Sequence, residues 1–341
     1  MTWMGARGER ECLSWMPRGS LEESPVSRHQ ACTSTYKVFL LFFCSSSFFC
    51  SFHLSLDAAP GRPDSGVPSS RRAAPMLEHR GLDRVVDLVR YPLADRTLRE
   101  RCARTLEEEG ALVLPKFLHR PAIDDALTQS LAREADAFFC TRSHNVFLLE
   151  PDPELPSDHP RNREVRSSKG ILADDQVDPQ SPLRTLYDSP LFREFLRSVT
   201  RANGPLHPYA DSLASVNVHV QRAGQELGWH FDNSSFAATV MLRPASSGGS
   251  FEYCPGTDRD AWDEREVMGA VTRCLDGVGP VRTLTPGPGD LTLFRGRRAL
   301  HRVTPTGENG DARVIAVLAY NETPGQRLSS TAMTTFFGRL G

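Results

Sequence analysis

The chain is 341 residues long, 39% hydrophobic and 24% charged, and its formal net charge is −2 at pH 7. This length and composition are typical of one large globular domain or two small ones. Because acidic and basic residues are nearly balanced and interspersed, the basic footprint of a nucleic-acid-binding protein is absent. We therefore expect no nucleic-acid partner.

The first seventy-five residues differ in composition from the rest of the chain. Residues 38–56 form an apolar stretch rich in Phe, Ser and Cys, and a Pro-, Gly-, Ser- and Arg-rich segment follows up to Ala74. A secretory signal would begin nearer the N-terminus, and the four glutamates upstream fit a transit peptide poorly. We predict that residues 1–75 are a disordered leader or a mis-called start, and that residues 76–341 are the folded domain of a cytoplasmic protein without a membrane partner. A membrane or organelle signal in the apolar stretch is the alternative.

Residues 76–205 are predicted to be mainly helical. The predicted helices span residues 98–109, 121–139 and 191–199. The first of them has Asp95 as a candidate N-cap and Gly110 just past its end, and a short strand follows at residues 111–115. Residues 141–182 are polar and dotted with prolines, so we expect an irregular segment of the kind that forms lids or binding loops.

Residues 206–325 are predicted to form strands. Residues 216–220 alternate between apolar and polar types, and residues 236–242 form a short apolar run, as in a buried strand. The turn at residues 286–290 delivers the next apolar run, and Arg313 opens a further strand. A charged, helix-like insert interrupts the strands at residues 258–275.

Four cysteines lie after residue 76, at Cys102, Cys140, Cys254 and Cys274. Their spacing matches neither a zinc site nor a disulfide framework. They are predicted to be free thiols in a reducing compartment.

Two histidines and one carboxylate on these strands carry the strongest functional signal. His230 and Asp232 are two positions apart, so on a strand both project to the same side while Phe231 turns away. With His301 from a later strand they form the ligand set that holds Fe(II) on one face and leaves the other open for oxygen chemistry. Arg313 supplies a cation able to bind a carboxylate with two hydrogen bonds. The competing interpretation, core histidines and an edge arginine, is weaker because the whole set falls in order on predicted strands.

With these residues the sequence resembles the non-haem Fe(II)/2-oxoglutarate-dependent oxygenases, and within them the branch of the free-lysine halogenases and their hydroxylase relatives. The matching phrases are SHNV at 143–146, RSSKG at 166–170, ADDQ at 173–176, ELGWHFD at 226–232, GSFEY at 249–253, LFRG at 293–296, LHRVTP at 300–305 and FGR at 337–339. The resemblance runs from about Met76 to the C-terminus. It implies a mainly β fold with flanking helices, whose core is a double-stranded β-helix of jelly-roll or cupin-like type.

The resemblance also implies the cofactors. These are Fe(II), 2-oxoglutarate and O₂, with ascorbate as a reductant in vitro. His230, Asp232 and His301 would be the metal ligands at the catalytic centre, and Arg313 would bind the distal carboxylate of 2-oxoglutarate. Asn217 and His219 share one strand face and are candidates for hydrogen bonds to the co-substrate, with the satisfaction of buried backbone groups as the alternative.

Asp232 indicates which reaction to expect. In the halogenases of this branch a halide takes the place of the carboxylate, and a small residue stands at that position. The chain is therefore predicted to be a dioxygenase that hydroxylates, and does not halogenate, a small amino-acid-like metabolite. By resemblance, Asn321 and Thr323 would face the substrate. Further candidate contacts are Asp211, Asn233, Arg166 and Lys169, for each of which a solvated surface side chain is at least an equal alternative.

Two other functions stay open at this point. The first is a cupin-like metal-dependent oxygenase or isomerase that does not use 2-oxoglutarate, and Arg313 argues against it because such a protein needs no guanidinium there. The second is a non-catalytic binding module of the same fold. The intact metal triad argues against that, because convergent ligands without a metal leave costly unpaired polar groups. The oligomeric state is not predicted.

Overall fold

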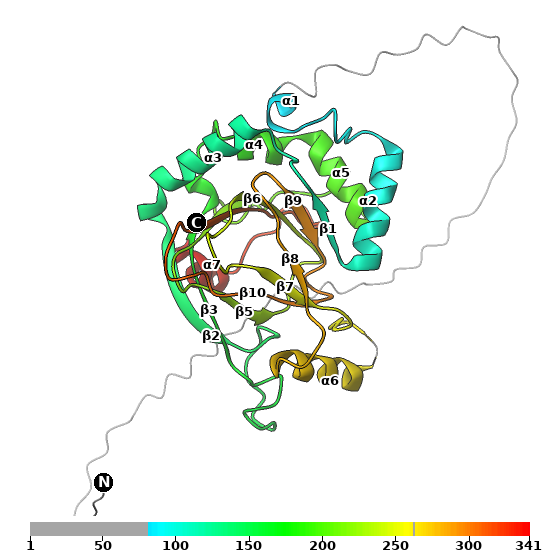
Figure 1. The fold of residues 1–341 in the computed structure, drawn as a ribbon, viewed down its shortest axis with the longest axis vertical. Coiled ribbons are helices and arrows are strands. Elements are labelled where there is room, and N and C mark those ends of the chain that lie inside the picture. Colours follow the sequence, from blue (N-terminus) through cyan, green and yellow to red (C-terminus); the bar gives the residue numbers. More distant parts are fainter. Residues whose placement is uncertain (1–80, 262) are drawn as a thin grey trace, which may run out of the picture. The chain divides into compact units, whose positions relative to one another are not determined.

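The computed structural model describes residues 81–261 and 263–341, which form a curved β-sheet with helices packed around it (Figure 1). The predicted leader, residues 1–75, and the predicted start at Met76 lie outside the described residues. Within residues 81–261 and 263–341, no helix is both long and apolar enough to cross a membrane.

Eleven strands in this part of the chain form one sheet, and every neighbouring pair in it is antiparallel. They are β1 (Ala111–Leu114), β2 (Phe138–His144), β3 (Val165–Leu172), β4 (Val216–Gln221), β5 (Leu227–His230), β6 (Ala237–Arg243), β7 (Phe251–Cys254), β8 (Arg282–Leu284), β9 (Leu291–Phe294), β10 (Leu300–Val303) and β11 (Arg313–Leu318). Their order is β1-β9-β6-β11-β4-β3-β5-β10-β7-β8, with β2 paired to β3. Each of the nine strands that follow β2 in the chain, β3 to β11, contributes residues to the lining of one cavity. The sheet therefore curls around this cavity. The predicted mainly β fold with a double-stranded β-helix core is confirmed.

Five helices cover the outside of the sheet around β4, β6, β9 and β11. They are α1 (Leu82–Val85), α2 (Arg96–Glu109), α3 (Arg120–Ala132), α4 (Pro182–Asp188) and α5 (Pro190–Thr200). Alternate strand residues such as Val218 and Leu293 are buried against them in the main hydrophobic core. Helix α2 has the predicted ends, because Asp95 accepts a hydrogen bond from Leu98 N at 2.6 Å and Gly110 closes it with φ 73°.

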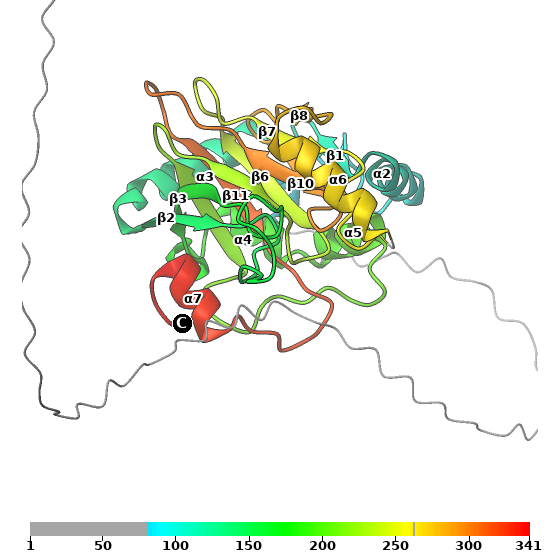
Figure 2. The same cartoon turned by 90° about the horizontal axis from the view of Figure 1, so that it is seen from below.

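Two further helices lie elsewhere on the sheet (Figure 2). The predicted insert contains α6 (Glu264–Leu275), which packs onto β5, β7 and β10. Helix α7 (Ser330–Phe337) packs against β2 and β3. The residues of the α6 contact form a separate hydrophobic cluster, called here the insert cluster: Val146, Phe147, Trp229, Phe231, Cys254, Val267, Val271, Cys274 and Leu300.

Of the segment predicted to be irregular, residues 141–182, the stretch 145–164 contains no helix or strand, but strands lie on both sides of it. Strand β2 ends in the predicted segment, and all of β3 and the 3-10 helix Asp174–Gln176 lie within that segment. The helix predicted at 121–139 ends at Ala132, because residues from Phe138 onward pair with β3. Strand β1 is the strand predicted at residues 111–115, whereas β2 and β3 join the sheet where no strand was predicted. Pairing with distant strands outweighs the local pattern here.

The prediction of four free thiols is wrong for two of them. Cys254 and Cys274 form a disulfide, whereas Cys102 and Cys140 are free. The pair joins the end of β7 to the last turn of α6, 20 residues later in the chain. Spacing along the chain does not reveal this pairing, because only the folding of α6 back onto β7 brings the two cysteines together.

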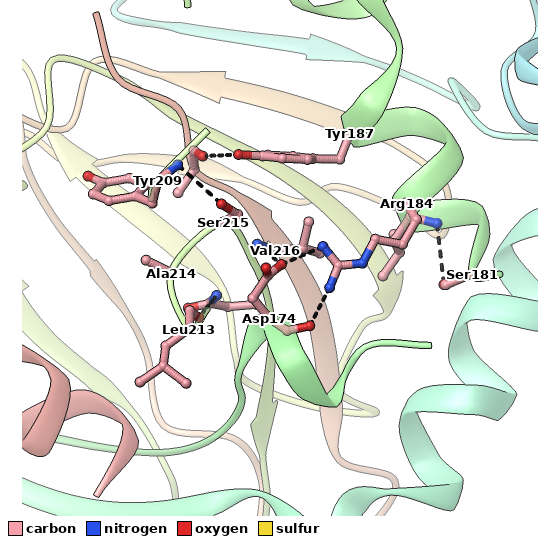
Figure 3. A network of polar contacts seen from close by, with 12 residues as sticks. Asp174, Ser181, Arg184, Tyr187, Tyr209, Leu213, Ala214, Ser215 and Val216 are labelled. Atoms are coloured by element: carbon pink, nitrogen blue, oxygen red, sulfur yellow. Dashed lines mark hydrogen bonds and ion pairs between the residues drawn. The ribbon is translucent and has the colours of Figure 1, made fainter. Parts of the chain in front are cut away.

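A buried polar network holds the start of β4, as Figure 3 shows. The Asp174 carboxylate accepts from Val216 N at 2.8 Å and from Arg184 Nη1 at 2.6 Å. The Tyr187 hydroxyl donates to the carbonyl of Ala319 at 2.8 Å, just beyond the end of β11. These bonds tie β4 and β11 to helix α4. The two strands therefore have a fixed position relative to the helices.

Candidate metal centre and co-substrate cavity

His230, Asp232 and His301 converge at one point of the sheet. The register of β5 and β10 places His301 directly opposite His230, and the two ring centroids are 4.2 Å apart. Asp232 Oδ1 lies 3.7 Å from His230 Nε2 and 3.5 Å from His301 Nε2. One ligand atom from each of the three residues lies within 4.8 Å of the others, which is close enough for a shared metal ion.

Backbone carbonyls orient both imidazoles. His230 Nδ1 donates to Gly228 O at 2.8 Å, and His301 Nδ1 donates to Ala299 O at 2.9 Å. Because a carbonyl can only accept, each Nδ1 carries a proton, and Nε2 is the ring nitrogen that each histidine turns toward Asp232. Burial, together with repulsion from His301, lowers the pKa of His230 to about 3. This histidine is therefore neutral, as a metal ligand must be.

Asp232 is ionised in this setting. Burial raises the pKa of its carboxyl, but the neighbouring His301, His230 and Lys169 outweigh burial and hold the pKa below its ordinary value. Two imidazole nitrogens and one carboxylate on one side of a point match the donor set of a non-haem Fe(II) centre.

A second set of bonds supports His230 from β3, the neighbour of β5, and from the end of β2. The Ser167 hydroxyl accepts from Gly228 N at 3.0 Å and contacts His144 Nε2 at 2.7 Å. His144 Nδ1 donates to the carbonyl of Asn145 at 2.9 Å, so its Nε2 accepts from Ser167. Ser167 and His144 were not predicted as site residues, and they act on the backbone that orients His230.

The triad borders a cavity of about 160 Å³. Its polar lining includes Lys169, His219 and Arg313, and apolar side chains such as Phe251, Phe294 and Val303 form much of the rest. A larger hollow of about 530 Å³ lies between α2 and α5, but none of the predicted site residues line it. The chemistry therefore belongs to the smaller cavity.

Arg313 is buried without an anionic partner. It is 3% exposed, and its Nη1 donates to Gln221 Oε1 at 2.8 Å, from the position opposite it on β4. Arg313 Nε and Gln221 Nε2 have no hydrogen-bond partner among the described residues, and Arg313 forms no ion pair there. Burial lowers the pKa of Arg313 to about 10, so the side chain still carries its charge at neutral pH. A buried guanidinium in this state is costly unless an anion occupies the cavity.

Lys169 is a second cation on the cavity wall. Its Nζ donates to His219 Nδ1 at 3.3 Å, which leaves His219 Nε2 with the proton and able to donate. Burial lowers the pKa of Lys169 to about 8, and burial with Lys169 and Arg313 nearby holds the pKa of His219 well below its ordinary value. The cavity thus offers two cations and a neutral imidazole on the same side.

The remaining predicted site residues lie away from the cavity lining. Asn217 donates to the carbonyl of Leu213 at 2.9 Å, so its amide satisfies buried backbone. Asp211 accepts from three backbone amides, those of Leu213, Ala214 and Leu328. The other four are Asn321, whose side chain accepts from Thr323 N, Asn233, which is half-buried, and Thr323 and Arg166, which are both exposed. Of the six predicted substrate contacts, the structure brings only Lys169 into the cavity.

Gln221 was missed by the sequence analysis although a signal was present. It stands two positions after His219 on β4, and it therefore shares the strand face of that residue. The aromatic residues beside His301 were missed as well. Phe251 and Phe294 lie with ring centroids 5.5 Å and 4.9 Å from that of His301.

Similar solved structures are weakly related to this chain. The non-haem alpha ketoglutarate dependent epimerase SnoN from nogalamycin biosynthesis is 17% identical, with a TM-score of 0.48 over 67% of this chain and 82% of that one. A prolyl hydroxylase from Trichoplax adhaerens is 14% identical, with a TM-score of 0.43 over 66% and 90%. A Pseudomonas putida prolyl-4-hydroxylase is 12% identical, with a TM-score of 0.41 over 68% and 100%. No curated protein matches.

The sequence of the chain matches a family more directly. The profile of the family described as Halogenase D matches residues 94–337, which is most of the chain. The matched region includes the metal triad, Arg313 and the sheet that carries them. The chain belongs to the Halogenase D family, within the non-haem Fe(II)/2-oxoglutarate-dependent oxygenases.

Proposed function

We propose that the protein is an Fe(II)- and 2-oxoglutarate-dependent dioxygenase that hydroxylates a C–H bond of a small amino-acid-like metabolite. The observation that carries the proposal is the convergence of His230, Asp232 and His301 beside a cavity in which Arg313 lacks an anionic partner. The residues fit the metal because the Nε2 atoms of both histidines lie within 3.7 Å of the Asp232 carboxylate. They form one side of a coordination sphere and leave the cavity side free.

The charges of the cavity fit 2-oxoglutarate, which carries two carboxylates. Arg313 would bind the distal carboxylate through the fork of its guanidinium, with Gln221 holding one of its nitrogens in place. Lys169 and His219 Nε2 would face a second anionic group, either the other carboxylate of the co-substrate or that of the substrate. When bound, the metal and co-substrate supply the oxidising chemistry, and the protein contributes placement and exclusion of water.

Asp232 supports hydroxylation over halogenation. Its carboxylate fills the position that a halide needs, and its lowered pKa keeps it ionised. The family is named after a halogenase. In contrast to a halogenase, this chain has a carboxylate, Asp232, in the ligand set, as a hydroxylating oxygenase does.

The size of the cavity is compatible with a small substrate. A volume of about 160 Å³ accommodates small molecules or a single side chain. The apolar side chains of Phe251, Leu227 and Val303 near the triad would pack against the carbon chain that is oxidised. Lys169 is then the proposed contact for an anionic end.

An anaerobic titration of the purified protein with Fe(II) and 2-oxoglutarate tests the cofactors. The expected result is the weak visible charge-transfer band of the chelate, and its absence with both present would refute the proposal. Aerobic incubation with a free amino-acid panel, ascorbate and chloride then tests the reaction by mass spectrometry. Gain of one oxygen atom without a chlorinated product supports hydroxylation, whereas a chlorinated product contradicts it.

A further inference from the structure

Gly296 lies directly beside Asp232, in the turn between β9 and β10. Asp232 N donates to Gly296 O at 3.1 Å, so the two backbones are in contact. A Cβ added to Gly296 would lie 1.8 Å from Asp232 Oδ2, 2.4 Å from its Cγ and 2.8 Å from its Cβ. These are the three nearest atoms, and each is closer than a real Cβ contact allows.

The backbone of Gly296 does not by itself require glycine. Its φ lies outside the left-handed region, unlike that of Gly289 in the preceding turn, where φ is 82°. A residue with a Cβ could adopt the same backbone conformation. What excludes a side chain at position 296 is therefore the carboxylate of Asp232.

The turn that carries Gly296 has little freedom to move away. Arg295 N donates to Gly110 O at 2.9 Å, and Arg298 N donates to Arg295 O at 2.8 Å. Arg297 donates twice to Asp260, at 2.6 Å and 2.9 Å. On the other side, Phe231 N donates to Val146 O at 2.8 Å, which fixes the backbone next to Asp232. A side chain at position 296 would therefore displace the carboxylate more readily than either backbone.

The two carboxylate oxygens face different neighbours. Oδ1 lies 3.5 Å and 3.7 Å from the two histidine Nε2 atoms, whereas Oδ2 occupies the space beside Gly296. We propose that Gly296 is the positioning residue for Asp232, and that the two positions form a matched pair that commits the centre to a carboxylate ligand. The inference rests on the proposed function in one respect, the role of Asp232 as a ligand.

A double-mutant cycle tests the pair with the full chain. The variants are Gly296→Ala, Asp232→Gly and the double variant, and each is measured without metal by thermal unfolding and anaerobically for Fe(II) affinity. Gly296→Ala is expected to lower Tm and to weaken Fe(II) binding roughly 10–100-fold, as other changes to groups supporting metal ligands do. In the Asp232→Gly background the same substitution should change both quantities far less, because no carboxylate remains to meet the new Cβ.

Two further variants make the test specific. In the Asp232→Ala background the Cβ of residue 232 remains, 2.8 Å from the added Cβ. Gly296→Ala should therefore lower Tm more in this background than in the Asp232→Gly background. Gly287→Ala is the matched control, since a Cβ there lies 3.7 Å from its nearest neighbour, an ordinary contact. This control should bind Fe(II) like the wild type.

Two results would overturn the inference. One is Fe(II) affinity unchanged by Gly296→Ala, and the other is an equal loss of Tm in the Asp232→Gly background, which would mean that the turn itself needs glycine. A wild-type protein that binds no Fe(II) would refute the proposed function instead. In that case, the Tm values of the four metal-free proteins in the double-mutant cycle would still show whether a side chain at position 296 clashes with Asp232.

Discussion

The two walls of the cavity are supported in different ways. Strands β4 and β11, which carry His219 and Arg313, have six residues each and are backed by the main core under five helices. Strands β5 and β10, which carry His230 and His301, have four residues each and are backed by the small insert cluster under α6. The proposed metal and co-substrate sites therefore depend on separate parts of the core. Substitutions can thus perturb the metal ligands and the Arg313 contact separately.

The largest expected effect is at the wall that carries the metal ligands. His301→Ala removes one of three ligand atoms, so Fe(II) affinity should fall at least about 100-fold, beyond the range typical of supporting residues. Calorimetric Fe(II) titration under nitrogen measures this. Near-normal binding would show that His301 is a core histidine and not a ligand.

A matched pair of leucines tests whether the two walls are independent. Leu300 precedes His301 in the insert cluster and Leu318 lies on β11 in the main core, and both are buried. Each substitution by alanine should cost about 2–5 kcal/mol of unfolding free energy. Only Leu300→Ala should also weaken Fe(II) binding. Equal effects on Fe(II) affinity would mean that the walls act as one unit.

Arg313→Lys tests the opposite wall. The lysine keeps the charge but loses the planar fork, so 2-oxoglutarate should bind about tenfold more weakly, or about 1.4 kcal/mol, with Fe(II) affinity near that of the wild type. Titrating the visible band with 2-oxoglutarate measures this. Arg327→Lys, at an exposed position, is the control and should leave both affinities unchanged.

The smallest expected effect is on stability, at Lys169. The pKa of Lys169 is about 8 in the folded protein, below its ordinary value of 10.5. Between these two values the unfolded chain binds more protons, so the unfolding free energy of the metal-free protein should rise with pH across that window. Lys169→Met should reduce this slope and stabilise the metal-free protein at pH 7, because a buried charge is removed. Urea unfolding at pH 7 to 10 measures both, and an unaltered slope would place the Lys169 ammonium in solvent.

Much of the site follows from short-range patterns in the sequence. The spacing of His230 and Asp232 predicts that both side chains project to one side, and they do converge although β5 ends at His230. Asp95 and Gly110 mark the ends of α2. Each of these signals depends on residues within one or two turns of the chain. The apolar run after Arg313 likewise predicts β11. The resemblance to a family added the co-substrate, which no local pattern reveals.

Only the tertiary structure decided which distant residues meet. The pairing of Cys254 with Cys274, the contact of Lys169 with His219 and the place of β3 in the sheet depend on strand order and on the folding of α6. The glycine at position 296 is also explained only by the tertiary structure. The atoms that exclude a side chain there belong to Asp232, 64 positions earlier in the chain, and no residue next to Gly296 in the sequence requires glycine. Local periodicity specifies on which face of a helix or strand a residue lies. The packing of the whole sheet decides which residues of other helices and strands that face contacts.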